Sequence, residues 1–123
     1  MTSHLNSTST HIEHIDRVAA ADVAALRVAE LHYGSSWKRR GGIGAFMMLA
    51  RKWDRIENAL RPHEMDQCTA NMSNAENPVA PWDVFAGVAA DPRDEGLIDD
   101  IRDLRRYLML VEAELVARGV VNV

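Results

Sequence analysis

The chain has 123 residues, 47% of them hydrophobic and only 6% aromatic, so it can form one core and favours packed helices over a β-sandwich. The formal net charge of -4 excludes a global positive field that would hold nucleic acid or an anionic membrane. The single Cys68 excludes an internal disulfide and a thiolate-rich zinc site, which fits a reducing cytoplasm. We expect neither a signal peptide nor a membrane span, because no apolar run is long enough.

The N-terminal part predicts a tail followed by a helix. Residues 1–10 are polar and rich in Ser and Thr, which indicates a flexible tail that ends in a helix cap at Ser9 or Thr10. From His11 to Tyr33 the apolar residues recur at helical spacing, so we expect the first helix there.

Two histidines lie one turn apart at the start of this predicted helix. His11 and His14 are spaced so that they could share a metal ion. No Cys or third His stands nearby in the sequence, so a solvated first turn is the better interpretation of the pair.

Residues 34–42 interrupt the helical pattern with three glycines, Trp37 and the cations Lys38, Arg39 and Arg40. This composition predicts a loop whose cations bind phosphates while the Trp lies against a base or sugar. The alternative is an exposed basic turn with the Trp folded back on the core. A Walker-type phosphate loop is excluded, because the Gly-Lys-Ser/Thr ending is absent.

The second predicted helix covers residues 43–60 and ends before Pro62. Glu57 falls within its apolar stripe and Asp54 lies on the edge of that stripe, so two carboxylates share one flank. A carboxylate that faces a core requires a paired cation or a metal ion. The stripe consists of Phe46, Leu49, Ala50, Trp53, Ile56 and Leu60.

The stretch after this helix has no stable period. Residues 61–81 are rich in Asn, Pro, Ser and Met, which predicts a long connection that serves binding or assembly. Residues 81–90 predict a short helix that brings Trp82 and Phe85 to the core or to a partner subunit, with the core as the preferred assignment.

The last predicted helix is capped by Asp91 or Asp94, runs to about Arg118 and ends at Gly119. The elements together predict an all-α helical bundle of about four helices in one domain, residues 11–119. The apolar stripe of the last helix consists of Leu97, Ile101, Leu104, Leu108, Val111 and Leu115.

A second pair of acids stands on this last helix. Asp100 lies at the edge of the stripe and Asp103 is one turn further on, the same relation that Asp54 has to Glu57. If the two seams face each other, four carboxylates converge and need cations to offset their repulsion. Sites made only of carboxylate oxygens suit Mg²⁺ or Mn²⁺. A di-iron bundle is disfavoured, because neither pair is Glu-x-x-His.

The alternative is an ordinary bundle without a metal. In that case Asp54 and Asp103 are surface residues, while neighbouring arginines neutralise Glu57 and Asp100. The candidate arginines are Arg55, Arg61 and Arg105.

Paired acids, one pair on each of two helices in an all-α chain, resemble those of the MazG-like nucleoside triphosphate pyrophosphohydrolases. The family pattern is Glu-x-x-Glu on one helix and Glu-x-x-Asp on the next, and here Asp54 and Asp100 replace the first Glu of each pair. The two runs 33–57 and 95–107 are similar to those of bacteriophage members of the family.

The resemblance implies an enzyme that cleaves a (d)NTP, with dGTP or GTP ranked first, between the α and β phosphates to give the monophosphate and pyrophosphate. It also implies a homodimer or homotetramer in the cytoplasm of a phage host, where the enzyme shapes the nucleotide pool. The implied ligands of Mg²⁺ or Mn²⁺ are Asp54, Glu57, Asp100 and Asp103, with Asp54 and Glu57 also catalytic. The cations and the aromatic residue expected to contact substrate are Trp37, Lys38 and Arg39.

A different class of function is open on the same sequence. The chain would then be a non-enzymatic helical interaction or regulatory protein of a phage, which binds a host protein through residues 61–90. Such a protein would not be stabilised by Mn²⁺ together with a nucleotide.

Overall fold

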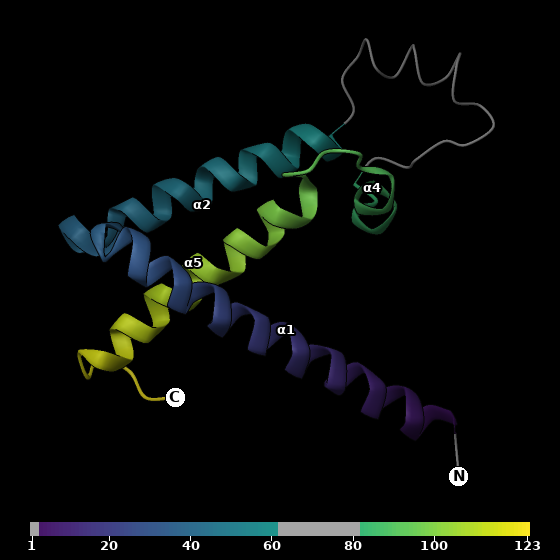
Figure 1. The fold of residues 1–123 in the computed structure, drawn as a ribbon, viewed down its shortest axis with the longest axis horizontal. Coiled ribbons are helices and arrows are strands. Elements are labelled where there is room, and N and C mark those ends of the chain that lie inside the picture. The colour runs from purple at the N-terminus through teal and green to yellow at the C-terminus, as the bar shows by residue number, and fades with distance from the viewer. Residues whose placement is uncertain (1–2, 62–81) are drawn as a thin grey trace.

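The structure is a computed structural model that describes residues 3–61 and 82–123, and over these ranges it contains helices and no strand (Figure 1). The predicted all-α architecture is confirmed. The predicted connection beyond Arg61, with Cys68, lies outside the described residues. The α-helices are α1 (Ser3–Tyr33), α2 (Arg39–Leu60), α4 (Val84–Ala90) and α5 (Leu97–Ala117), and a 3-10 turn covers Ser36–Lys38. None of these helices has the length and apolar character needed to cross a bilayer.

Helix α1 begins at Ser3, so the predicted start at His11 and the cap at Ser9 or Thr10 are wrong. Neither Gly nor Pro occurs before Gly34, and Ser and Thr weaken a helix only slightly, so nothing stops the helix from extending towards the N-terminus. The helix ends where Gly34 adopts a φ of 65°, a left-handed conformation that glycine takes without steric cost.

The regular part of α2 begins near Ile43, as predicted. Before it, Arg40, Gly41 and Gly42 have φ values of 54°, 71° and 83°, which bend the chain between the 3-10 turn and the helix. This bend brings the backbone of Trp37 so close to the helix that a Cβ on Gly44 would lie 3.1 Å from the Trp37 carbonyl oxygen. The loop that carries Trp37 is therefore packed on the start of α2.

The core lies between α2 and α5, with α4 against one end of the pair (Figure 1). Ile56, Leu60 and Leu97 form the buried cluster, and its apolar area is excluded from water on both helices. Residues of the two helices meet in antiparallel order, since Arg55 contacts Asp100 while Lys52 contacts Asp103. The partly buried side chains around the cluster are Val84, Val88, Ile101 and Leu104.

The predicted apolar stripe of α2 is only partly correct. Leu49, Ile56 and Leu60 are buried, but Phe46 and Trp53 are 52% and 50% exposed. The packed face is therefore rotated away from Trp53, and Glu57 lies on the flank of the seam and is half-buried rather than inside the core. Helix α2 carries apolar residues around more than half of its circumference, so the periodicity alone does not select the packed face.

Helix α4 does not bring its aromatic residues into the core, so that assignment is wrong. Phe85 is 90% exposed, and the ring of Trp82 stacks on that of Trp53 with centroids 6.0 Å apart at the surface. Asp83 caps the helix by accepting a hydrogen bond from Ala86 N at 3.0 Å. Gly87 faces inwards instead, since a Cβ there would lie 2.7 Å from Leu60 Cδ2, and Val84 and Val88 pack against the core.

Two acids and one glycine set the limits of α5. The N-cap residue is Gly96, but Asp91 Oδ2 accepts from Leu97 N at 2.7 Å, so its side chain caps the first turn, and Asp99 Oδ2 accepts from Gly96 N at 3.2 Å. The helix ends just before Gly119, whose φ is 74°, as predicted.

The cap at Asp91 predicts acid sensitivity. Hydrogen bonds from the Arg93 side chain, and secondly from Leu97 N, hold the pKa of Asp91 well below its ordinary value of 3.8. As the pH falls below about 4 the unfolded chain binds the proton first, so the free energy of unfolding should decrease through this range. Urea unfolding between pH 5 and about 2 should show a weaker pH dependence for Asp91→Asn than for the native chain. The control Asp94→Asn, at an exposed acid nearby, should follow the native curve.

Candidate functional site

The acids of α5 lie against two cations of α2. Asp100 is only 1% exposed, and its Oδ1 lies 3.0 Å from Arg55 Nε and 3.7 Å from Lys52 Nζ. Lys52 Nζ also lies 3.0 Å from Asp103 Oδ2, so one ammonium bridges both carboxylates. The sequence predicts that these carboxylates need a cation beside them. Lys52 and Arg55 supply that positive charge.

Two buried atoms of this cluster, Asp100 Oδ2 and Arg55 Nε, make no hydrogen bond with the described residues. Asp100 Oδ2 is buried and accepts no hydrogen bond from the described residues. Arg55 Nε contacts the other carboxylate oxygen, but its N–H is not aligned for a hydrogen bond. A buried carboxylate oxygen without a donor is costly, so the position favours a further ligand such as water or a cation.

The acids of α2 have different surroundings. Glu57 accepts hydrogen bonds from Trp53 Nε1 at 3.1 Å and from Arg61 Nη1 at 2.9 Å. Asp54 is exposed. Since Asp54 follows Lys52 by two residues, it lies about 200° round the helix from the side chain that faces α5.

Two of the ion pairs in the metal-free interpretation are therefore present, Arg55 with Asp100 and Arg61 with Glu57. Within residues 3–61 and 82–123 no group of three or more acids, histidines or cysteines is close enough to hold a metal ion. The structure brings Asp100 and Asp103 together but does not add Asp54 or Glu57 to them. The four-ligand metal site stays a prediction.

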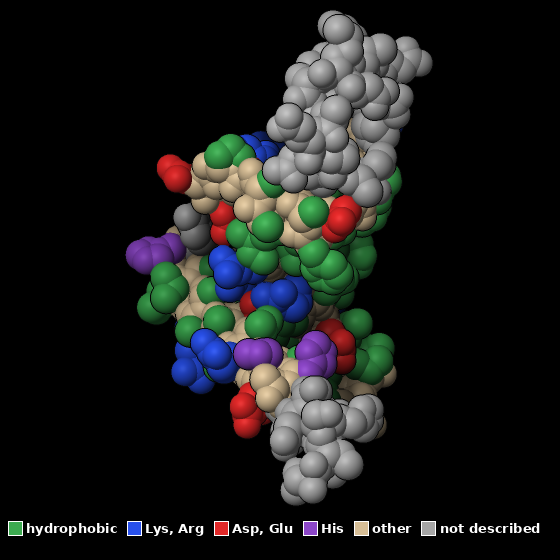
Figure 2. All heavy atoms as spheres, turned by 90° about the vertical axis from the view of Figure 1, so that its right-hand side faces the viewer, with side chains coloured by type: hydrophobic (Ala, Val, Ile, Leu, Met, Phe, Trp, Pro, Cys, Tyr) green, Lys and Arg blue, Asp and Glu red, His purple; other side chains and the backbone are tan. Residues whose placement is uncertain are grey.

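A basic groove on the other side of α5 was not predicted from the sequence. It lies between α1 and α5 and has a volume of about 540 Å³. In the side view of Figure 2, Lys and Arg side chains lie near the middle of the molecule, with histidine side chains below them. The lining residues are His14, Arg17, Val18, Ala21, Arg102, Arg105 and Arg106.

A buried acid of α1 organises this groove. Asp22 is 1% exposed, and it accepts hydrogen bonds from both Nε and Nη2 of Arg105 and from Arg106 Nε, the last at 2.8 Å. The hydrogen bonds from Arg105 hold the pKa of Asp22 below its ordinary value, although burial acts in the opposite direction. Two features of the sequence could have indicated this ion pair. One is Asp22, a lone acid in the Ala- and Val-rich stretch 18–29, and the other is the Arg105-Arg106 dipeptide in the last helix.

The predicted substrate loop lies at the far end of α5. Lys38 Nζ pairs with Glu114 Oε1 at 3.3 Å, Trp37 is half-buried, and Arg39 is exposed. Glu114 follows Asp103 by eleven residues, which is roughly 16 Å along the helix. In one chain, therefore, the loop contacts Glu114 but does not reach Asp100 or Asp103.

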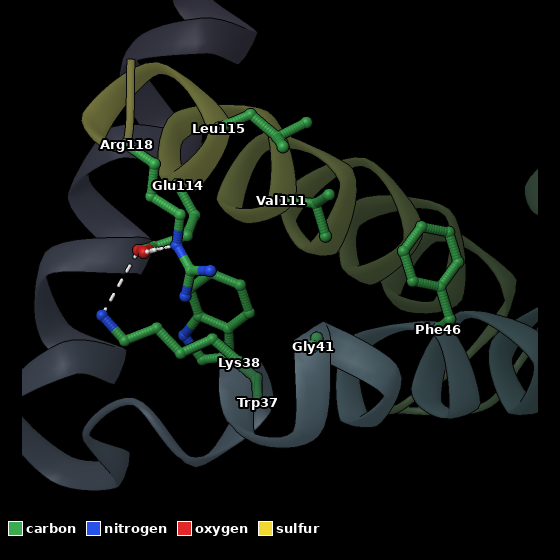
Figure 3. A pocket seen from close by; sticks show the side chains of 9 residues that line it. Trp37, Lys38, Gly41, Phe46, Val111, Glu114, Leu115 and Arg118 are labelled. Carbon is green, nitrogen blue, oxygen red and sulfur yellow. Dashed lines mark hydrogen bonds and ion pairs between the residues drawn. The ribbon is translucent and has the colours of Figure 1, made fainter. Parts of the chain in front are cut away.

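The cavity at this loop is small. It has a volume of about 80 Å³, well below the several hundred Å³ of most ligand pockets. Figure 3 shows the side chains of Lys38 and Arg118 meeting at the carboxylate of Glu114. Hydrogen bonds from Arg118, and secondly from Lys38, hold the pKa of Glu114 below its ordinary value. The lining residues are Trp37, Lys38, Gly41, Gly42, Phe46, Val111, Glu114, Leu115 and Arg118.

Comparisons of the chain with known protein families, with curated proteins and with solved structures found no match.

Proposed function

We propose that the protein is a metal-dependent nucleotide pyrophosphohydrolase that converts a (d)NTP, dGTP or GTP first, to the monophosphate and pyrophosphate. The observation that supports it best is the pair of acids on α5. Asp100 is buried beside Asp103 and keeps one carboxylate oxygen without a donor among the described residues. The acid spacing also resembles that of MazG-like enzymes, which would place the activity in the nucleotide pool of a phage-infected cytoplasm.

The two α5 acids suit Mg²⁺ or Mn²⁺, because Mg²⁺ is commonly bound through one or two carboxylates while waters and substrate phosphates complete its ligands. Asp100 and Asp103 would hold such an ion, which neutralises phosphate charge and promotes attack by water. Lys52 contacts both acids in the structure, so the ion would displace its ammonium group, which would then add positive charge beside the phosphates.

The remaining predicted site residues require a second copy of the chain in this proposal. Trp37, Lys38 and Arg39 lie far along the helix pair from Asp103, and neither Asp54 nor Glu57 is grouped with it. A homodimer or homotetramer could bring them to a neighbouring site. Phe46 and Trp53 of α2 are each about half exposed and support packing against another copy, because exposed apolar side chains favour association.

The test is hydrolysis over a panel of the eight common ribo- and deoxyribonucleoside triphosphates, each with Mg²⁺ or Mn²⁺. We expect the monophosphate and pyrophosphate in equal amounts, separated by chromatography, with the highest rate for dGTP or GTP. Nucleotides that remain unchanged across the whole panel would contradict the proposal. Release of single phosphates would contradict cleavage between the α and β positions.

The second candidate is a non-enzymatic interaction protein, and the exposed aromatic residues at the start of the described C-terminal part favour it. Phe85 of α4 is 90% exposed, and Trp82, three residues earlier, is 43% exposed. A thermal melt separates the two candidates. A large increase in Tm with Mn²⁺ plus nucleotide favours the hydrolase, and an unchanged Tm favours the interaction protein.

A further inference from the structure

The groove between α1 and α5 concentrates positive charge on a chain of net charge -4. Arg17 comes from α1, whereas Arg102, Arg105 and Arg106 come from α5. Its volume of about 540 Å³ lies within the usual range for small-molecule pockets. Guanidinium groups this close together repel one another unless an anion lies among them.

Two of these arginines are fixed in position by the protein itself. Asp22 binds Nε and Nη2 of Arg105 and Nε of Arg106, so these guanidinium groups hold a set orientation. Nη1 of Arg105 and both terminal nitrogens of Arg106 are not bonded to Asp22, so donors remain for a ligand. Groups that are ordered before binding lose less entropy when the ligand arrives.

The other two arginines are not neutralised to the same degree. Arg102 Nη1 lies 3.7 Å from Asp99 Oδ1, a long contact between exposed groups, which contributes little. Over the two described ranges no ion pair joins Arg17 to an acid. Asp22 neutralises one of the four arginine charges in the groove. The groove therefore keeps a net positive charge that an anionic ligand can neutralise.

We propose that this groove binds the phosphate chain of a small phosphorylated molecule. Arg102 and Arg106 are four residues apart, about 6 Å along the helix, which places their donors along a short row of phosphates. Guanidinium groups bind phosphate oxygens in a bidentate manner that ammonium groups do not reproduce. A long polyanion fits less well, because beyond the groove it would meet a surface of net negative charge.

This inference does not rest on the proposed hydrolase activity, because binding here needs neither a metal ion nor turnover. The probe is inorganic tripolyphosphate, titrated into the full chain by isothermal calorimetry at about 150 mM salt with EDTA present. We expect binding of one tripolyphosphate per chain. Arg17→Gln and Arg102→Gln should each weaken it about tenfold, since each removes a charge-assisted contact without touching Asp22.

The matched control is Arg27→Gln, which removes the same charge from an exposed position of α1 outside the groove. It should leave the Kd within about twofold of the native value, because Arg27 lies ten residues, roughly 15 Å, further along α1 than Arg17, and the Debye length at this salt is only about 8 Å. Circular dichroism should give each variant the helix content of the native chain, which checks that α1 is still helical. Equal losses in all three variants, or no binding by the native chain, would overturn the proposal.

A single-stranded oligonucleotide provides the second arm of the experiment. We expect it to bind more weakly than tripolyphosphate under the same conditions. Tighter binding of the oligonucleotide that is lost in Arg17→Gln and Arg102→Gln but not in Arg27→Gln would make nucleic acid the occupant and would overturn the small-ligand proposal.

Discussion

Replacement of Asp22 by Ala should lower the free energy of unfolding by about 3 kcal/mol. The side chain is 1% exposed and accepts hydrogen bonds from Arg105 and Arg106, so its loss leaves two partly buried guanidinium groups without their acid. Helix α1 buries few other large side chains, because Ile12, Ile15 and most of its apolar residues are exposed. We therefore expect the variant to release α1 from α5.

Urea unfolding followed by circular dichroism measures the loss of stability, and amide hydrogen exchange shows whether it is confined to α1. Asp16→Ala is the matched control, since Asp16 is an exposed acid of the same helix. It should change the free energy of unfolding by less than about 0.5 kcal/mol. Equal stability of Asp22→Ala and the native chain would mean that the Asp22 ion pair does not hold α1 in place.

Replacement of the α5 acids should have the largest effect on the proposed hydrolysis. Asp103→Asn should reduce kcat/KM at least about hundredfold, because the neutral amide is a poor ligand for Mg²⁺ and leaves the phosphates less well neutralised. Asp103 is partly exposed, so this variant should fold. Asp100→Asn should reduce turnover as strongly but also destabilise the chain, since it removes the buried partner of Arg55.

Replacement of Asp54 and Glu57 tests whether the predicted metal ligands on α2 belong to the site. Asp54→Asn and Glu57→Gln should abolish turnover with unchanged helicity if a second copy brings them to the site. Asp16→Asn serves again as the control and should keep native kinetics. Loss of activity in Asp103→Asn with full activity in both α2 variants would restrict the site to α5. Full activity in the variants of all four acids would show that none of these carboxylates belongs to the active site.

The predicted helices agree with the structure where local chemistry sets their limits. Gly119 ends α5 and Asp91 caps it, because a left-handed glycine and a carboxylate near free N–H groups act within a few residues. The bend at Gly41 and Gly42 likewise delays the regular part of α2. The start of α1 was missed, since Ser and Thr are compatible with either a tail or a helix and no local signal separates the two.

For the candidate site, the sequence predicted which residue types are present but not which of them contact each other. The acid pairs were visible at helical spacing, and Arg55 and Arg61 were correctly named as partners for Asp100 and Glu57. The rotation of α2 was not visible. Apolar residues surround much of that helix, so the face that packs depends on the partner helix, where Lys52 and Arg55 meet the acids of α5.

The residue pattern was enough to predict an all-α protein, the limits of its last helix and the charged side chains. Which of these charges meet became visible only in the packed helices. Asp22 binds Arg105 and Arg106 across more than eighty residues of chain. Helical periodicity specifies faces within one element, whereas the choice between possible partners depends on how whole helices pack and exclude water from the ions between them.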